Sequence, residues 1–397
     1  MKGQRIGVVG LGTIGTQEIE LWERAGYPVV GYDISAARVQ ALTAANKAER
    51  RQETRLTTDF GDLAECDAII VCLPNLGPSG ELSLAAFDSF ARELQALPSA
   101  ERLVIIASTV PIGFTHSFAS RSEARGVLVA HAPERFDPGR GTELGEINRV
   151  IGATSAKALK LASDLYIKAG VPIHQVDPVE VAEASKLLEN AFRLVNIAFI
   201  NEFAELCRRM GIVAADVIDA AATKPFAFMA HKPGVGAGGT CIPTMPLYLL
   251  EAAKRIQLDM PILKDAVAGN DKTVEHVAGH LGELLKSGGI TRGRILVVGA
   301  TYKPNYPDAR GSAALRFSRG LAAHHDVVVY DPIVDATGLA EDVQLIRNLP
   351  RDENFDAIVI AVKHRDTDAA ALRLLSPILI DLVRGSVEVV ESISSHQ

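Results

Sequence analysis

Cys241 is the residue of this chain best suited to covalent chemistry. It follows a glycine-rich run in the stretch 231–246, HKPGVGAGGTCIPTMP. The stretch opens with His231, and its glycines are Gly234, Gly236, Gly238 and Gly239. Glycines at this density let a backbone approach a ligand closely and expose N–H groups to anionic oxygens. A thiol presented by such a loop is a candidate nucleophile, although a flexible turn followed by a buried thiol fits the same letters.

A dinucleotide-binding motif lies near the start of the chain. The motif consists of Gly10, Leu11, Gly12, Thr13, Ile14 and Gly15. It follows an apolar stretch at 5–9 that is typical of a buried strand, and it opens a helix predicted over 14–25. Asp33 ends the next predicted strand, 29–32, which is the context that such a motif requires. Free N–H groups and the helix dipole favour a pyrophosphate at the N-terminus of the helix. Asp33 would accept hydrogen bonds from ribose hydroxyls and repel a 2′-phosphate, so the motif predicts NAD rather than NADP.

Two further predicted strands end in polar side chains. Apolar segments at 68–73, 103–107, 127–130 and 171–175 alternate with helical spacing, which predicts an open α/β sheet in this part of the chain. Thr109 follows the second of these strands and Glu134 follows the third, at the carboxyl ends where ligands of such sheets bind. Ordinary turn chemistry explains each of them as well.

A long helix is predicted over 178–210. After Pro178 the segment holds no Pro or Gly, and apolar residues recur at helical spacing. A helix of this length is typical of a core-spanning or dimer-forming element. Lys186 and Asn190 share one face of it, and Arg193 lies three residues further along. Their spacing fits a solvated surface, and it also fits a cationic acid/base and an amide donor turned toward a cofactor.

A second α/β unit follows the cysteine loop. A helix is predicted over 261–285, a linker over 287–289, and strands over 294–299, 327–330, 357–362 and 378–381. The segment 301–312, TYKPNYPDARGS, joins strand to helix and offers Lys303 and Arg310. These residues are either surface charges on a connector or groups that hold the phosphates or ribose of a nucleotide.

The composition excludes several classes of function. The 397 residues carry 41 Lys and Arg against 48 Asp and Glu, a net charge of −7, so nothing favours nucleic acid or an anionic membrane as partner. Four scattered cysteines predict neither a disulfide framework nor a metal site. No apolar run is long enough to span a bilayer, and the first strand leaves no room for a signal peptide. We therefore expect a reduced, cytoplasmic protein of two or three domains.

Together these segments resemble the nucleotide-sugar 6-dehydrogenases, the family of UDP-glucose and UDP-N-acetylhexosamine dehydrogenases. The resemblance runs in order through VVGLGTIG, IIVCLP, ASTVPIG, APERFDPG with INRVIG, EASKLLENAFRLVNIAFINE, HKPGVGAGGTCIP and GATYKPNYPDARGS. The PER and HKPG segments are more similar to the UDP-N-acetylmannosamine and UDP-N-acetylglucosamine branch. The resemblance implies an α/β fold with two Rossmann-like parallel-sheet domains, joined by a helical dimerisation domain with one long central helix. The implied boundaries are 1–177 for the NAD-binding domain, 178–286 for the helical domain and 287–397 for the nucleotide-sugar-binding domain.

The resemblance also assigns roles by position. Cys241 matches the nucleophile, and Lys186 and Asn190 match residues that stabilise and protonate developing oxyanions. Thr109 and Glu134 match groups that hold water and balance acid and base. The implied cofactor-binding residues are Gly10, Gly12, Thr13, Ile14, Gly15, Asp33, Pro74, Thr109 and Arg310. The implied substrate-binding residues are Arg193, His231, Gly234, Gly236, Gly238 and Lys303. The implied reaction oxidises the C6 alcohol of a UDP-N-acetylhexosamine to the uronic acid, through an aldehyde and a Cys241 thioester, with two NAD taking four electrons.

Two positions depart from the family pattern GGHC.P.D. Thr240 replaces a histidine, and Met245 replaces a carboxylate that helps to activate the hydrolytic water. A thioether cannot accept a proton from water, so the departure concerns the last step of the reaction. Two other functions stay open: a two-electron β-hydroxyacid-type dehydrogenase and a nucleotide-sugar-binding homologue without catalysis. The yield of NADH per sugar separates the three functions as two, one or none.

Overall fold

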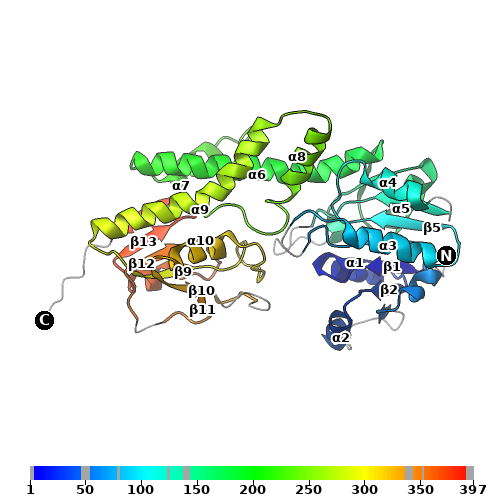
Figure 1. Cartoon of the computed structure of the whole chain (residues 1–397), viewed down its shortest axis with the longest axis horizontal. Coiled ribbons are helices and arrows are strands. Elements are labelled where there is room, and N and C mark those ends of the chain that lie inside the picture. Colours follow the sequence, from blue (N-terminus) through cyan, green and yellow to red (C-terminus); the bar gives the residue numbers. More distant parts are fainter. Residues whose placement is uncertain are drawn as a thin grey trace. The chain divides into compact units, whose positions relative to one another are not determined.

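The chain folds into two compact units, residues 1–189 and 190–397, each built around its own sheet (Figure 1). The structure is a computed structural model that describes residues 4–45, 54–77, 81–122, 126–136, 144–335, 343–350 and 353–389. The predicted run APERFDPG lies partly outside these residues, since 137–143 are not described. Among the helices of the described ranges, none is long and apolar enough to cross a membrane.

The first unit holds an eight-stranded sheet. In sheet order its strands are β3 (Thr54–Thr57), β2 (Val29–Tyr32), β1 (Ile6–Val9), β4 (Ala68–Val71), β5 (Arg102–Ile106), β6 (Val127–His131), β7 (Arg149–Ala153) and β8 (Ile173–Gln175). Neighbours run parallel except β6 and β7. The strand order reverses at β1, between β2 and β4, and the carboxyl ends of strands at such a point form the usual ligand crevice of an open α/β sheet.

Helices supply the apolar layers on the two faces of this sheet. They are α1 (Thr13–Arg24), α2 (Ala36–Ala45), α3 (Ala85–Ala96), α4 (Phe114–Ser122) and α5 (Ala156–Lys168). On one face Trp22 and Tyr166, from α1 and α5, pack with ring centroids 5.2 Å apart. On the other face Phe90 and Phe118, from α3 and α4, stack at 5.9 Å. The buried aromatic rings hold α1 firmly against the strands that lead into the glycine motif.

The second unit holds a smaller, six-stranded sheet. In sheet order its strands are β11 (Gln344–Ile346), β10 (Asp326–Tyr330), β9 (Arg294–Val298), β12 (Ala357–Ile360), β13 (Ile378–Asp381) and β14 (Ser386–Val389). Only β13 and β14 pair antiparallel among these strands of the described residues. Its helices are α7 (Ala214–Ala222), α8 (Met245–Arg255), α9 (Pro261–Ser287), α10 (Ala313–Ala322) and α11 (Ala369–Arg373). The predicted α/β fold with two parallel-sheet domains is confirmed.

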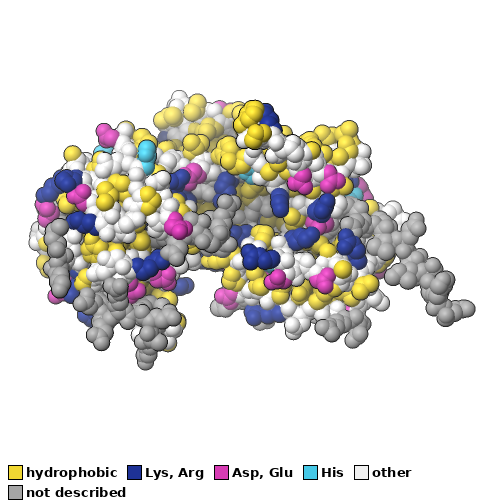
Figure 2. All heavy atoms as spheres, turned by 180° about the vertical axis from the view of Figure 1, so that it is seen from behind, with side chains coloured by type: hydrophobic (Ala, Val, Ile, Leu, Met, Phe, Trp, Pro, Cys, Tyr) yellow, Lys and Arg dark blue, Asp and Glu magenta, His cyan; other side chains and the backbone are white. Residues whose placement is uncertain are grey.

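Helix α6 (Val179–Arg209) begins in the first unit and ends in the second. It carries a stripe of exposed apolar side chains, Val181, Leu188, Phe192, Phe199 and Leu206, and the exposed Met210 follows its last residue. Leu188 is 64% and Phe199 63% exposed, and the spacings of seven and four residues are those of a helix that packs on another helix. Hydrophobic side chains are also visible on the face of the molecule that Figure 2 draws.

Four strands were not predicted from the sequence: β3, β7, β11 and β14. β3, β11 and β14 have only three or four residues each and lie at the edges of their sheets. β7 begins with Arg149, which is only 3% exposed although an arginine usually lies at the surface. Its burial depends on two distant carboxylates, which a local sequence pattern does not reveal.

Candidate active site

The dinucleotide motif forms a tight turn between β1 and α1. Gly10 adopts a left-handed φ of +89°, and a Cβ on Gly15 would lie 1.8 Å from the Gly10 carbonyl oxygen, so neither position tolerates a side chain. A Cβ on Gly12 would have open space around it, with nothing within 4 Å. Gly12 is also the N-cap residue of α1 and makes no side-chain cap. The open space and the uncapped N–H groups suit a pyrophosphate, so the residues present fit NAD.

Asp33 already supports this turn. One oxygen of its carboxylate accepts the Leu11 backbone N–H at 2.8 Å, and the other accepts the Ser35 N–H at 2.8 Å. Each oxygen keeps a lone pair for a ribose hydroxyl. Arg38 of α2, which was not predicted as a site residue, donates to the Leu11 carbonyl at 3.3 Å and so places a cation beside the same turn. The sequence signal that could have identified Arg38 is its position five residues after Asp33, on the next helix.

The ends of β4 and β5 are tied together. The Ser108 hydroxyl donates to the carbonyls of Val71 and Leu73, at 3.2 and 2.8 Å. The Asn75 amide donates to the Thr109 carbonyl at 2.9 Å, which fixes the segment that carries the half-buried Thr109 side chain. Pro74, between Leu73 and Asn75 in the sequence, is exposed.

Glu134 lies in a buried ion-pair cluster. Its side chain is 8% exposed, and one oxygen accepts from Arg149 Nη1 at 2.7 Å. The other oxygen accepts the Phe136 backbone N–H. Arg149 Nη2 donates to Glu18 of α1 at 2.8 Å, so one guanidinium is shared by two carboxylates. Glu134 is therefore fixed in position, with one lone pair on each oxygen still available.

Helix α6 presents the next group of predicted residues. Glu183, fully buried, accepts the backbone N–H groups of Gly113 and Thr115 at 2.6 and 2.7 Å, and so caps the start of α4. Lys186, three residues later, is half-buried, and Asn190 is 4% exposed. The alternative of a solvated surface is therefore wrong for Asn190. Arg193 is half-buried on the same helix.

Two buried asparagines hold the glycine loop before Cys241. Asn201 of α6 accepts the Gly234 N–H at 2.9 Å. Asn270 of α9 accepts the Ala237 N–H at 2.5 Å and donates back to the Ala237 carbonyl at 3.4 Å. Neither asparagine was predicted as a site residue. An amide within an apolar helical pattern was the only sequence signal, and its partner lies 33 residues away in each case.

The same loop packs against the segment 301–312. Gly239 has a φ of +84° and donates its N–H to the Gly311 carbonyl at 3.1 Å. A Cβ on Gly239 would lie 2.8 Å from the Tyr302 ring, and one on Gly238 would lie 3.0 Å from the Ala313 nitrogen. The structure thus brings together the predicted cysteine loop and the predicted nucleotide-binding segment, and only glycine allows so close an approach.

The charged residues of segment 301–312 are both oriented by neighbours. The Lys303 ammonium lies 5.8 and 5.0 Å from the ring centroids of Tyr302 and Tyr306. Arg310 is exposed, and Asp308 engages its Nε and Nη2, the latter at 2.6 Å. This hydrogen bond with Asp308 raises the pKa of Arg310, so the guanidinium stays charged.

Cys241 is exposed, and its carbonyl accepts the N–H of Met245, the first residue of α8, at 2.9 Å. The Thr240 hydroxyl is 3.9 Å from the Cys241 sulfur. Met245 is only 3% exposed, so its thioether packs inward. His231 hydrogen-bonds through Nδ1 to the Met229 carbonyl at 2.9 Å. The Cys241 thiol is thus accessible, as a nucleophile must be.

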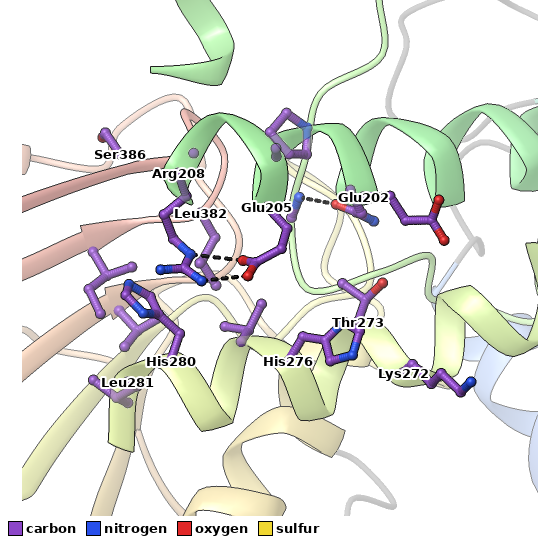
Figure 3. Close-up of a pocket in the computed structure, with 18 of the residues that line it drawn as sticks. Glu202, Glu205, Arg208, Lys272, Thr273, His276, His280, Leu281, Leu382 and Ser386 are labelled. Atoms are coloured by element: carbon purple, nitrogen blue, oxygen red, sulfur yellow. Dashed lines mark hydrogen bonds and ion pairs between the residues drawn. The ribbon is translucent and has the colours of Figure 1, made fainter. Parts of the chain in front are cut away.

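A cavity of about 200 Å³ lies behind the glycine loop, between α6, α9 and the sheet of the second unit (Figure 3). Glu205 and Arg208 pair along its wall at 2.8 and 2.5 Å, and His276 and His280 face them from α9. This bonding lowers the pKa of Glu205 to about 2. Of the described residues that line the cavity, none is a predicted catalytic residue, although Gly234 forms part of the wall. Of the glycine loop, Pro233 and Gly234 line this cavity.

Comparisons with known proteins agree with this geometry. The UDP-glucose/GDP-mannose dehydrogenase family models match in three parts: the NAD binding domain at 4–169, the central domain at 180–272 and the UDP binding domain at 296–384. UDP-N-acetyl-D-mannosamine dehydrogenase of Pyrococcus horikoshii is 34% identical, over 91% of this chain and 89% of the relative. UDP-N-acetyl-D-glucosamine 6-dehydrogenase of Pseudomonas aeruginosa is 30% identical, over 92% of each chain.

A solved structure shows the same likeness in three dimensions. The structure of UDP-D-ManNAc dehydrogenase from Pyrococcus horikoshii superposes with a TM-score of 0.84 at 31% identity, and the match covers 96% of both chains. Sequence and fold thus agree along nearly the whole chain. The chain belongs to the UDP-glucose/GDP-mannose dehydrogenase family and is an NAD-dependent oxidoreductase of that family.

Proposed function

We propose that this enzyme oxidises the C6 alcohol of a UDP-N-acetylhexosamine to the uronic acid in two NAD-dependent steps. The observation that carries the proposal is the exposed Cys241 on a glycine loop that packs directly against the Lys303 segment of the UDP-binding domain. The names of the relatives support UDP-N-acetylmannosamine or UDP-N-acetylglucosamine as substrate. We retain the division into residues 1–177, 178–286 and 287–397 as part of the proposal.

The reaction balances with Cys241 as the only covalent group. NAD, when bound, accepts one hydride in each oxidation. The C6 alcohol first loses a hydride and a proton and becomes an aldehyde. The Cys241 thiolate then adds to the aldehyde carbon, and the former carbonyl oxygen takes up a proton to give a thiohemiacetal. Loss of a second hydride and of that proton leaves a thioester. Water adds to the thioester carbon, the C–S bond breaks, and the carboxylate and the free thiol are formed.

Four other residues have proposed roles in these steps. Lys186 and Asn190 donate to the oxygen that carries negative charge while the aldehyde and thiohemiacetal react, because preorganised donors stabilise such charge most strongly in a dry site. The burial of Asn190 supports this role. Thr109 orients the hydrolytic water, and Glu134 takes its proton, which the fixed carboxylate with free lone pairs supports.

The remaining predicted residues hold the two ligands. We propose that the cofactor contacts Gly10, Gly12, Thr13, Ile14, Gly15, Asp33, Pro74, Thr109 and Arg310. We propose that the substrate contacts Arg193, His231, Gly234, Gly236, Gly238 and Lys303. The loop N–H groups approach the sugar phosphates closely because glycines leave them uncovered, and Lys303 supplies a positive charge.

Met245 makes hydrolysis the proposed slow step. Its buried thioether lies where a carboxylate is expected from the family pattern, and a thioether accepts no proton from water. General-base assistance contributes typically ~10²–10⁴-fold to such a step. The enzyme would then depend on Thr109 and Glu134 alone for the hydrolytic water.

We propose further that α6 forms the core of a homodimer. Its exposed apolar stripe, with Leu188, Phe192 and Phe199, supports this assembly because large apolar side chains at heptad spacing are stabilised by packing on a second helix. A cytoplasmic location stays a prediction.

The decisive experiment is the NADH yield per sugar. Purified enzyme with limiting UDP-N-acetylmannosamine or UDP-N-acetylglucosamine and excess NAD should form two NADH per sugar. The Cys241→Ser variant is the matched control, because it should bind substrate and yet lose sustained turnover. A yield of one NADH would support a β-hydroxyacid-type dehydrogenase, and a yield of none a binding protein.

A further inference from the structure

A cluster of three buried charges connects the helix of the dinucleotide motif with the carboxyl end of β6. Glu18 is 0%, Arg149 3% and Glu134 8% exposed. The Arg149 guanidinium lies between the carboxylates, with Nη2 2.8 Å from Glu18 Oε1 and Nη1 2.7 Å from Glu134 Oε2. Two carboxylates share one cation, so this Glu18–Arg149–Glu134 triad carries one excess negative charge unless it binds a proton.

Among the titratable groups around the triad, the two carboxylates are the ones that can bind this proton. Trp22 Nε1 donates to the second oxygen of Glu18 at 3.1 Å, and the Tyr166 ring lies 5.0 Å from the Arg149 guanidinium carbon. The other titratable groups that face the triad are Cys72, after β4, and the Tyr166 hydroxyl of α5. Burial raises the pKa of Cys72 and of Tyr166, so both stay protonated near neutral pH.

Glu18 lies too deep to serve a ligand directly. It is fully buried, and both of its oxygens have partners within the unit, Arg149 and Trp22. Burial raises the pKa of Glu18; the Arg149 charge opposes this, and the Glu134 charge adds to it. The protonation of Glu18 thus depends on the charges of Arg149 and Glu134. Carboxylates that interact in this way gain and lose protons as a coupled pair.

We propose that Glu18 is a positioning residue: it shares the Arg149 guanidinium with Glu134 and so holds Glu134 in place to take a proton from the hydrolytic water. Glu18 binds one side of the Arg149 guanidinium and Glu134 binds the other. This contact fixes the orientation of Glu134, but Glu134 shares the positive charge of Arg149 with Glu18. The inference rests on the proposed function, whose last step needs a base. In that step a proton of the water moves to the triad while the water oxygen bonds to the thioester carbon. The C–S bond breaks, and Cys241 leaves as the thiolate.

The Glu18–Arg149–Glu134 triad is important for hydrolysis because Met245 supplies no base. Without the charge of Glu18, the whole guanidinium charge would neutralise Glu134, and a neutralised ion pair is a weaker proton acceptor. With it, the guanidinium is shared between two carboxylates and Glu134 keeps its position. A fully structural role for Glu18 would affect the stability of the unit and leave the pH dependence of hydrolysis unchanged.

The test compares Glu18→Gln and Glu18→Met with wild type, and each removes the charge with little change in volume. We measure the NADH burst and the slow steady-state rate as functions of pH, with a UDP-N-acetylhexosamine and NAD. Burst amplitude should be unchanged. The acid limb of the steady-state rate should move to lower pH, and the plateau should fall by roughly threefold to tenfold, a part of what general-base catalysis supplies.

Three further variants separate the effect of the Glu18 charge from the effect of its packing. Glu18→Asp keeps the charge and should restore the wild-type acid limb. Trp22→Phe removes only the indole donor and should lower stability while it leaves the acid limb in place. In the double variant Glu18→Gln with Glu134→Gln, loss of the Glu18 charge should have no additional effect on the pH dependence, because the coupled partner is absent.

The outcomes distinguish this inference from the proposed function. An acid limb that stays in place in both charge-removing variants, with normal NADH formation, overturns the role of Glu18 alone. Absence of NADH formation by wild type with every UDP-N-acetylhexosamine overturns the proposed function and this inference with it.

Discussion

His131 makes the first unit sensitive to acid. It is the last residue of β6, is fully buried, and burial lowers its pKa to about 3 from the usual 6.5. Below pH ~6.5 the unfolded chain binds a proton at this ring and the folded chain does not, so the free energy of unfolding falls as the pH falls. The loss continues until pH ~3, where the folded state also binds the proton.

The magnitude follows from the shift. One pH unit between the two pKa values is worth about 1.36 kcal/mol, so His131 alone should lower the free energy of unfolding by about 2 kcal/mol between pH 7 and pH 5. The variant His131→Leu should lack this dependence. The exposed His174 of β8 provides the matched control, since His174→Gln should keep the wild-type slope.

The assay is urea unfolding at pH 7 and pH 5, followed by tryptophan fluorescence. Trp22 is the single tryptophan of the chain and lies fully buried in the first unit, so its emission reports on that unit. An equal decrease of the free energy of unfolding in wild type and His131→Leu would refute the reasoning. The same data define the pH range in which rates report chemistry rather than unfolding.

Three further predictions concern cofactor choice, catalysis and assembly. Asp33→Ser should raise the ratio of kcat/KM for NADP to that for NAD by ~10–100-fold, the worth of one charged hydrogen bond, and a wild-type preference for NADP would refute the assignment. Lys186→Ala should lower the rate of the NADH burst by ~10²–10³-fold, as loss of one oxyanion donor does, whereas a raised KM with an unchanged burst rate would assign Lys186 to uniform binding. Phe199→Glu should convert a dimer into a monomer in light scattering, and a monomeric wild type at micromolar concentration would argue against the α6 interface.

Local patterns in the sequence sufficed for the regular core. The strand before Gly10, the helix after it and the strand that leads to Asp33 all follow the predicted bounds within two residues. The long helix predicted over 178–210 is α6, Val179–Arg209. These elements have continuous apolar runs or strict helical spacing, which depend on neighbours in the chain and not on distant contacts.

The support of the site could not be predicted in this way. The buried Arg149 depends on Glu18, 131 residues earlier, and the loop before Cys241 depends on Asn201 and Asn270. The local sequence pattern does not show whether a polar side chain on a helix bonds to solvent or to a distant backbone group. The strand β7 was missed for the same reason, because its first residue is an arginine that is buried by ion pairs.

The most direct test of the central claim is intact-mass spectrometry of the enzyme, mixed with a UDP-N-acetylhexosamine and excess NAD, with NADH absorbance recorded in parallel. We predict a burst of about two NADH per active site, then a slow steady state, because general-base assistance worth typically ~10²–10⁴-fold is reduced at Met245. An acyl adduct should be found on Cys241 and be absent in Cys241→Ser. Turnover at an ordinary roughly 1–10 s⁻¹ without burst or adduct would contradict both the slow hydrolysis and the accumulation of a Cys241 thioester.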